Sequence, residues 1–244
     1  MNNKGGLLVE GLSQWFATVW EEICSGINST FIVDNRWTWF LSGLENTLLI
    51  SLFSVLLGLV LGLVTALFRL SNSKLLKAIG GTYVDVIRGT PTMVQLLLIY
   101  FVIFASVPIP RMIVGIIAFG INSGAYIAEI VRGGILSVNK GQTEAGRSLG
   151  LTGAQTMVFI VIPQAIKNIL PALANEFIVL IKETAVIGMV DNVDLVGAAK
   201  KVQSRTYDYF WPLISIAVIY YIVIKLLSVL LSRFEERLRK SDVR

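Results

Sequence analysis

Long uncharged apolar stretches dominate the chain and predict membrane-spanning helices. A helix needs about 20 mostly apolar residues to cross a bilayer. Three such stretches carry no charged residue, a fourth encloses Glu176, Lys182 and Glu183, and a fifth encloses Lys225. The five predicted spans are residues 46–68, 90–110, 112–128, 172–190 and 211–232. The pattern therefore predicts an all-α integral membrane protein with five transmembrane helices.

Residues 1–43 precede the first span and show a different pattern. Apolar side chains recur there at helical spacing, while Glu21 and Glu22 fall on other faces of the same helix. The apolar set is Leu8, Leu12, Trp15, Phe16, Val19, Trp20 and Ile23. This pattern favours an extracytoplasmic amphipathic helix lying in the outer membrane interface. A sixth crossing is the alternative, and it would have to bury Glu10 at a cost.

Basic residues predict the orientation of the spans. The loop after the first span, the long loop after the third and the C-terminal tail hold about twice as many Lys and Arg residues as the opposite side. Cytoplasmic loops carry such an excess. We therefore expect residues 238–244 to form a cytoplasmic tail and the N-terminus to lie outside. The net charge of +5 is then a topology signal, and no nucleic-acid partner is expected.

Composition narrows the possible chemistry. Hydrophobic residues make up 55% of the chain and charged residues 15%, and there is no histidine. The single cysteine, Cys24, excludes an intrachain disulfide and a cysteine-based metal site. The commonest general base and metal ligand are absent. We expect no metal, no cofactor and no catalytic residue on this chain, which leaves little from which to build a membrane-embedded enzyme.

The stretch 141–152, with sequence GQTEAGRSLGLT, lies in the predicted cytoplasmic loop between spans three and four. It predicts a short helix with Glu144 in its first turn, where a negative charge suits the helix dipole. Gly150 follows the predicted helix, at the usual position of a left-handed C-cap residue. A capped helix held away from the bilayer is well suited to docking on a soluble partner.

The same loop carries a family resemblance. Glu144-Ala145, Gly150 and Ile160-x-Ile162-Pro163 have the spacing of the "EAA" loop of ABC importer permeases, which they resemble. Gly146 stands where the family has alanine, and glycine lowers helix stability by up to about 1 kcal/mol relative to alanine. Three further stretches are similar to polar-amino-acid permeases: 83–96, 124–133 and 182–184. The resemblance covers about residues 44–237, the expected transmembrane domain.

This resemblance implies a working assembly in a bacterial cytoplasmic (inner) membrane. It implies a second permease subunit, identical or homologous, two cytoplasmic ATPases that bind ATP and Mg, and an external substrate-binding protein that delivers an amino acid. The chain itself would bind no cofactor and would carry a coupling helix that contacts the ATPase. The residues implied in that contact are Glu144, Ala145, Gly146, Leu149 and Gly150.

Two alternatives bear on energy coupling. Gly141-x-x-x-x-Gly146-Arg147-Ser148 nearly matches a phosphate-binding P-loop, but arginine replaces the essential lysine and no buried strand precedes it. ATP binding is therefore expected on a separate subunit. An ion-coupled secondary amino-acid transporter is the other alternative. Such transporters often show internal repeats, and the sequence has none that we recognise.

Three acidic residues are candidates for the substrate path. Glu176 and Glu183 are seven residues apart and share one helix face, where they either line the path or pair with a basic group. Glu129 either pairs with Arg132 at i,i+3 or holds the amino group of a substrate. The acidic residues favour a cationic amino acid such as arginine, lysine or histidine, with glutamine as the next candidate. Gly58 and Gly62 predict close packing of the first span on an unidentified neighbour.

Overall fold

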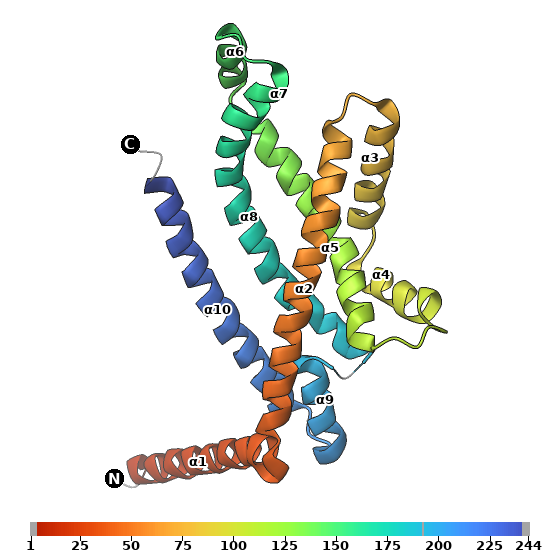
Figure 1. The fold of residues 1–244 in the computed structure, drawn as a ribbon. Helices are drawn as coiled ribbons and strands as arrows, with labels where there is room; N and C mark the ends of the chain where they lie inside the picture. Colours follow the sequence, from red (N-terminus) through yellow and green to blue (C-terminus); the bar gives the residue numbers. More distant parts are fainter. Residues whose placement is uncertain (1–3, 192, 241–244) are drawn as a thin grey trace.

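The computed structural model describes residues 4–191 and 193–240, with side chains described for 11–191 and 193–237. Within these ranges the regular structure is helical, as predicted. The longest elements are α1 (Lys4–Ile27), α2 (Trp37–Leu70), α5 (Arg111–Leu136), α8 (Ile162–Glu183) and α10 (Phe210–Lys240). Figure 1 shows α2, α5 and α8 side by side, with α10 running along the other side of α8.

Four helical segments are long and apolar enough to cross a membrane: 37–70, 111–136, 153–189 and 210–237. The third is continuous through α7 (Gly153–Thr156), the π-helical turn η4 (Met157–Val161), α8 and the 3-10 helix η5 (Thr184–Met189). A bent pair of helices provides a fifth crossing if it is counted as one span. The all-helical membrane fold with up to five spans is confirmed for the described residues.

The bent pair corrects the predicted second span. Residues 90–110 do not form one straight helix: they hold α4 (Thr92–Leu98), the π-helical turn η3 (Ile99–Ile103) and a non-helical connection. They are preceded by α3 (Lys74–Arg88), which meets the α4–η3 segment at 103°; if the bent pair is one span, that span begins in α3. In Figure 1, α3 runs beside α2 and α4 turns away from the bundle. Because α3 carries charged residues, the search for long uncharged runs did not include it in a predicted span.

Proline explains the position of the bend. Pro91 restricts the backbone of the preceding residue and caps α4 from an extended conformation. The side chain of Gln95 then donates hydrogen bonds from Nε2 to the carbonyl oxygens of Ile87 (2.7 Å) and Thr90 (3.1 Å). These bonds satisfy carbonyl groups at the end of α3 that the helix itself cannot pair.

Helix α5 forms the centre of the bundle, and α2 packs along it. A Cβ atom at Gly58 would lie 3.0 Å from Ser123 Cβ, and one at Gly62 would lie 2.6 Å from Ile127 Cγ2. The absence of side chains at these two positions lets the helix backbones approach closely. The neighbour of the Gly-xxx-Gly pair is therefore α5 of the same chain. Large buried side chains here include Ile50, Phe119 and Ile127.

A second, smaller core lies at the end of the bundle where α2 begins. Helix α9 (Leu195–Thr206) packs there between α2 and α10 through Phe40, Leu195, Val202 and Ile216. Asp194 caps α9, because its Oδ1 accepts a hydrogen bond from the backbone N–H of Gly197 at 2.9 Å. This packing anchors one end of α10, whose middle and far end are largely uncovered in the chain alone.

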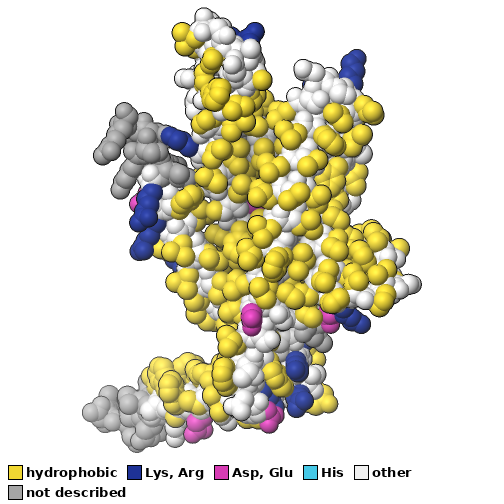
Figure 2. Space-filling model, in the orientation of Figure 1, with side chains coloured by type: hydrophobic (Ala, Val, Ile, Leu, Met, Phe, Trp, Pro, Cys, Tyr) yellow, Lys and Arg dark blue, Asp and Glu magenta, His cyan; other side chains and the backbone are white. Residues whose placement is uncertain are grey.

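Helix α1 forms the predicted N-terminal helix and lies across the end of the bundle opposite α6 (Lys140–Ser148) (Figure 1). It joins α2 through the π-helical turn η1 (Asn28–Ile32) and the 3-10 turn η2 (Val33–Asn35). The side chains of Leu8 and Glu10 lie outside the described residues. On the face seen in Figure 2, hydrophobic side chains cover the middle of the bundle and charged side chains lie mainly toward its ends. Such a band is typical of a lipid-facing surface.

Candidate functional site

Helices α6 and α7 form a projecting tip at one end of the bundle (Figure 1). Asn139 caps α6, because its Oδ1 accepts a hydrogen bond from the backbone N–H of Gly141 at 2.8 Å. The helix therefore begins at Lys140, and Glu144 lies beyond its first turn. The prediction that Glu144 lies in the first turn was wrong, since Asn139 is a stronger start signal than the residues just before Glu144.

The C-terminal end of α6 is closed by a left-handed glycine, which confirms that prediction. Gly150 has φ +88°. The N–H of Leu151 bonds to the carbonyl oxygen of Gly146 (3.1 Å) and the N–H of Gly150 to that of Arg147 (3.1 Å), which together make a Schellman motif. The Arg147 guanidinium also donates to the carbonyl oxygen of Leu151 at 2.9 Å. With both ends capped, α6 is a locally rigid unit.

Gly146 fits α6 onto the chain that follows it. It is buried, and a Cβ atom there would lie 2.7 Å from Ile160 Cδ1 and 3.0 Å from Thr156 Cγ2. Glycine at this position, where the resembled loop has alanine, thus allows α6 to approach the following chain closely. The other implied contact residues, Glu144, Ala145, Leu149 and Gly150, are exposed, and the Leu149 side chain is 83% exposed. The tip presents them outward while its inner side rests on η4.

Glu129 forms an ion-paired bridge between two helices. Its carboxylate contacts Arg69 of α2 and Arg132 of α5, so both of its oxygens are engaged with guanidinium groups. The sequence predicted the pair with Arg132, and only the structure brings in Arg69. This arrangement ties α2 to α5, and it leaves Glu129 poorly placed to bind a substrate.

Glu176 and Glu183 lie on α8 in two different settings. The Glu176 side chain is buried between α8 and α5, where its Oε1 accepts a hydrogen bond from Ser123 Oγ at 3.0 Å. Glu183 is half-buried at the end of α8. Glu129 lies six residues beyond Ser123 on α5, about 9 Å along the helix axis. The three candidate carboxylates therefore do not form one cluster.

Sequence reasoning missed a polar group at the bend between α3 and α4. Buried Asn122 of α5 donates from Nδ2 to Gln95 Oε1 at 2.9 Å, which joins the bend to the central helix. Asp85 and Arg88 are exposed beside it, and Arg88 lies over the Tyr126 ring at 5.2 Å. Charges inside a span usually face a water-filled cavity or a partner. The sequence signal for this bend was Gly89-Thr90-Pro91, which ends four residues before Gln95.

No group of three or more His, Cys, Asp or Glu side chains that could hold a metal ion occurs among the residues whose side chains are described.

Comparison with known proteins identifies the family. A family model described as "binding-protein-dependent transport system inner membrane component" matches residues 58–240. The chain belongs to this family. The C-terminal part of α2 (residues 58–70), the α6 tip and all of the later spans lie within the matched region, whereas α1 lies outside it.

Individual relatives agree with this assignment. A putative glutamine transport system permease protein of Rickettsia typhi is 40% identical over 79% of this chain and 89% of its own length. An arginine transport system permease protein of Bacillus subtilis is 36% identical over 83% of this chain and 93% of its own length. A crystal structure of an amino acid ABC transporter with histidines matches with a TM-score of 0.80 and 48% identity, over 85% and 98% of the two chains.

Proposed function

We propose that this chain is the membrane-spanning subunit of an ATP-driven importer of polar amino acids in a bacterial cytoplasmic membrane. The observation that carries the proposal is α6, a helix capped at both ends and exposed at one end of the bundle. It occurs in a chain that is 48% identical to a chain of an amino acid ABC transporter. In this proposal α6 is the coupling helix, and it contacts a separate ATPase that holds ATP and Mg.

The packing of α6 suggests how a push from the ATPase would reach the membrane. Gly146 rests on Thr156 and Ile160, and η4 continues without a break into α8. A displacement of α6 would therefore act directly on the helix that carries Glu176 and Glu183. Closely packed contacts transmit displacement well because protein interiors are poorly compressible.

The proposed assembly contains a second permease subunit, identical or homologous, two cytoplasmic ATPases and an external substrate-binding protein. The end of the bundle with α6 is cytoplasmic, and α1 and α9 lie outside, in agreement with the excess of basic residues on the α6 side. The exposed charges at the α3–α4 bend then lie inside the membrane. They are suited to a water-filled path between the two permease subunits.

We propose a cationic amino acid as the first substrate to test and glutamine as the second. Glu183 and the exposed Asp85 offer negative charge within the spans, whereas Glu129 is neutralised by two arginines. The names of the relatives include both arginine and glutamine transport. Attraction between unlike charges in a poorly polar environment favours a cationic side chain.

Radiolabelled amino-acid uptake into proteoliposomes tests the proposal. The permease is purified with the ATPase that it retains, and uptake is measured with and without ATP on the ATPase side. We expect uptake that requires ATP and falls at least tenfold in Glu144→Ala and Gly150→Arg. The first variant removes an exposed charge of α6, and the second places a side chain at φ +88°.

Gly81→Ala is the matched control, because a Cβ atom at this α3 position has open space around it. It should transport like the wild type. Uptake that ignores ATP and follows an ion gradient would instead favour a secondary transporter.

A further inference from the structure

Helix α1 is a 24-residue element outside the matched family region, and the transport mechanism proposed above does not use it. It lies across the long axis of the bundle, at the end opposite α6 (Figure 1). Large apolar side chains on it are exposed, including Trp15 (58%), Phe16 (63%) and Trp20 (67%). Exposed apolar side chains in such number mark an interaction surface.

The side chains of α1 separate into two faces. With 3.6 residues per turn, Leu12, Phe16, Val19, Ile23 and Ile27 fall along one side of the helix. The opposite side is polar and consists of Gln14, Thr18, Glu21 and Ser25. Trp15 and Trp20 fall at the two edges of the apolar side, about 140° apart. Tryptophan at such a boundary is characteristic of the membrane–water interface.

The two faces of α1 have a definite direction relative to the bundle. In Figure 2, hydrophobic side chains lie along the side of α1 that faces the apolar band, and acidic side chains lie on its far side. A bilayer around the band would thus meet the apolar face of α1. A soluble protein approaching from the far side would meet the acidic face.

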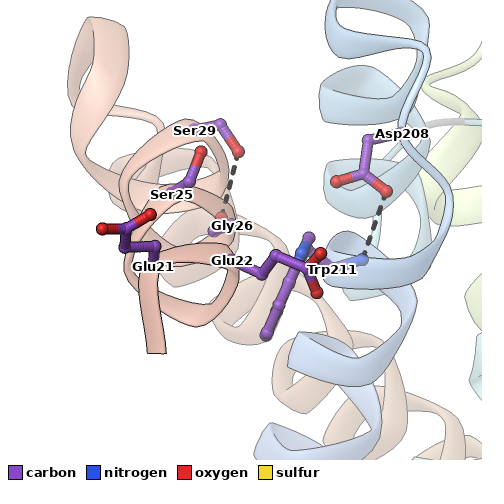
Figure 3. Close-up of a pocket in the computed structure, with 7 residues that line it drawn as sticks. All are labelled: Glu21, Glu22, Ser25, Gly26, Ser29, Asp208 and Trp211. Carbon is purple, nitrogen blue, oxygen red and sulfur yellow. Dashed lines mark hydrogen bonds between the residues drawn. The ribbon is translucent and has the colours of Figure 1, made fainter. Parts of the chain in front are cut away.

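A close contact with α10 holds α1 in this direction. Gly26 is buried against the Trp211 indole, where a Cβ atom would lie 2.1 Å from Cε2. In Figure 3 the Trp211 ring lies beside the α1 backbone. The buried Arg36 also donates from Nη1 to the carbonyl oxygen of Ser29 at 2.6 Å, which stabilises the turn between α1 and α2.

The polar side of this junction is suited to water. A notch of about 410 Å³ lies beside this contact, between α1 and the start of α10, and is open to solvent. Its lining includes the carboxylates of Glu21, Glu22 and Asp208 (Figure 3). Three carboxylates would be costly to place in the bilayer interior. The notch therefore belongs on the aqueous side of the helix.

We propose that α1 is an in-plane membrane helix that binds the lipid interface of the leaflet at the end opposite α6. Its apolar face enters the boundary between headgroups and acyl chains, the two tryptophans lie at the boundary, and the carboxylates face water. Only the name of this leaflet, the outer one, rests on the proposed function. The helix widens the lipid contact of the permease beside α10 and fixes the depth of this end of the bundle.

Spin labels in proteoliposomes of phosphatidylcholine and phosphatidylglycerol test this proposal. Cys24 is the sole cysteine, so a Cys24→Ser background allows one label at a time. Phe16→Cys places a label on the apolar face, and Gln14→Cys is the matched control about 160° around the helix. We expect the label at 16 to collide mainly with oxygen and the label at 14 mainly with a water-soluble nickel chelate, with at least a threefold difference in the collision ratio.

Two outcomes would overturn the proposal. Equal exposure of both labels to the nickel chelate would mean that α1 stands off the bilayer, as a surface for a soluble partner does. Shielding of both labels from the chelate would mean that α1 crosses the membrane. Leu12→Cys and Thr18→Cys provide a second pair if Phe16→Cys does not fold. The measurement needs no ATP or substrate, so its failure is distinct from failure of the transport proposal.

Discussion

At the residue scale, Asp194 combines two opposing properties. Its carboxylate caps α9 through Gly197, and the side chain is fully buried. Burial raises the pKa of Asp194 to about 6, because a buried charge loses its hydration, although backbone N–H donors and Lys200 partly compensate. The unfolded chain releases this proton near pH 4. The folded protein therefore binds an additional proton between about pH 4 and pH 6, and this group's contribution to stability falls as pH rises through that window.

Asp194→Asn should remove this pH dependence while keeping the cap, since asparagine caps helices about as well as aspartate. We expect the thermal midpoint of the Asn variant to rise relative to the wild type between pH 4.5 and pH 7. Asp194→Ala is the matched comparison: it loses the cap and should be destabilised by about 1 kcal/mol relative to the Asn variant. An Asn variant whose midpoint follows the wild type at every pH would show that the buried charge has no effect on stability.

At the element scale, the contact between α2 and α5 depends on two glycines. A Cβ atom at Gly62 would lie 2.6 Å from Ile127 Cγ2 and 3.0 Å from the backbone nitrogen of Ala128. The first of these neighbours is buried, and the second belongs to the backbone. Neither can move without separating the two helices.

Gly62→Val should therefore destabilise the protein by about 1–3 kcal/mol through overpacking. Gly133→Ala is the matched control on α5, where a Cβ atom meets open space, and it should be neutral or stabilising by about 0.5–1 kcal/mol. Thermal unfolding in detergent measures both variants. Equal midpoints for the two variants would show that α2 and α5 separate at little cost.

The α3–α4 bend shows a different balance at the same scale. Composition favours 90–110 as an uncharged span, but Pro91 makes the chain turn there and Gln95 and Asn122 stabilise the turn. If the bent pair is one span, it begins in a long α3 that carries Lys74, Lys77, Asp85 and Arg88. Charges are acceptable in such a helix where it faces water or a partner instead of lipid.

At the scale of the whole molecule, the candidate acidic residues of the spans differ in whether other side chains engage them. Glu129 bridges Arg69 and Arg132, and Glu176 accepts a hydrogen bond from Ser123. Glu183 is half-buried at the end of α8, and among the residues whose side chains are described its carboxylate forms no ion pair and accepts no hydrogen bond. Within the proposed importer, Glu183 is the candidate for contact with substrate.

Glu183→Gln should lower the preference for arginine over glutamine at least fivefold, measured by competition in ATP-driven uptake. Glu129→Gln is the contrasting variant, because it leaves two arginines without their carboxylate and should lower the thermal midpoint without changing that preference. A Glu183→Gln variant with wild-type preference and wild-type pH dependence of uptake would assign a structural role to this residue as well.

Local sequence patterns were enough to predict the helical membrane fold, the glycine that ends α6, and the family. Lipid exposure demands long apolar runs and helix ends demand particular residues, so both leave local marks that can be read along the chain. The family motif is likewise a matter of spacing within one loop.

Three features became clear only from the folded chain: which helix contacts Gly58 and Gly62, which residues hold Glu129 and Glu176, and how the chain bends at Pro91. Arg69 is 60 residues from Glu129, and Ser123 is 53 residues from Glu176. Such pairings depend on how the helices pack, and no local pattern encodes them. The direction of α1 was also decided in this way, because a contact between Gly26 and Trp211, far apart in the sequence, sets which way its apolar face points.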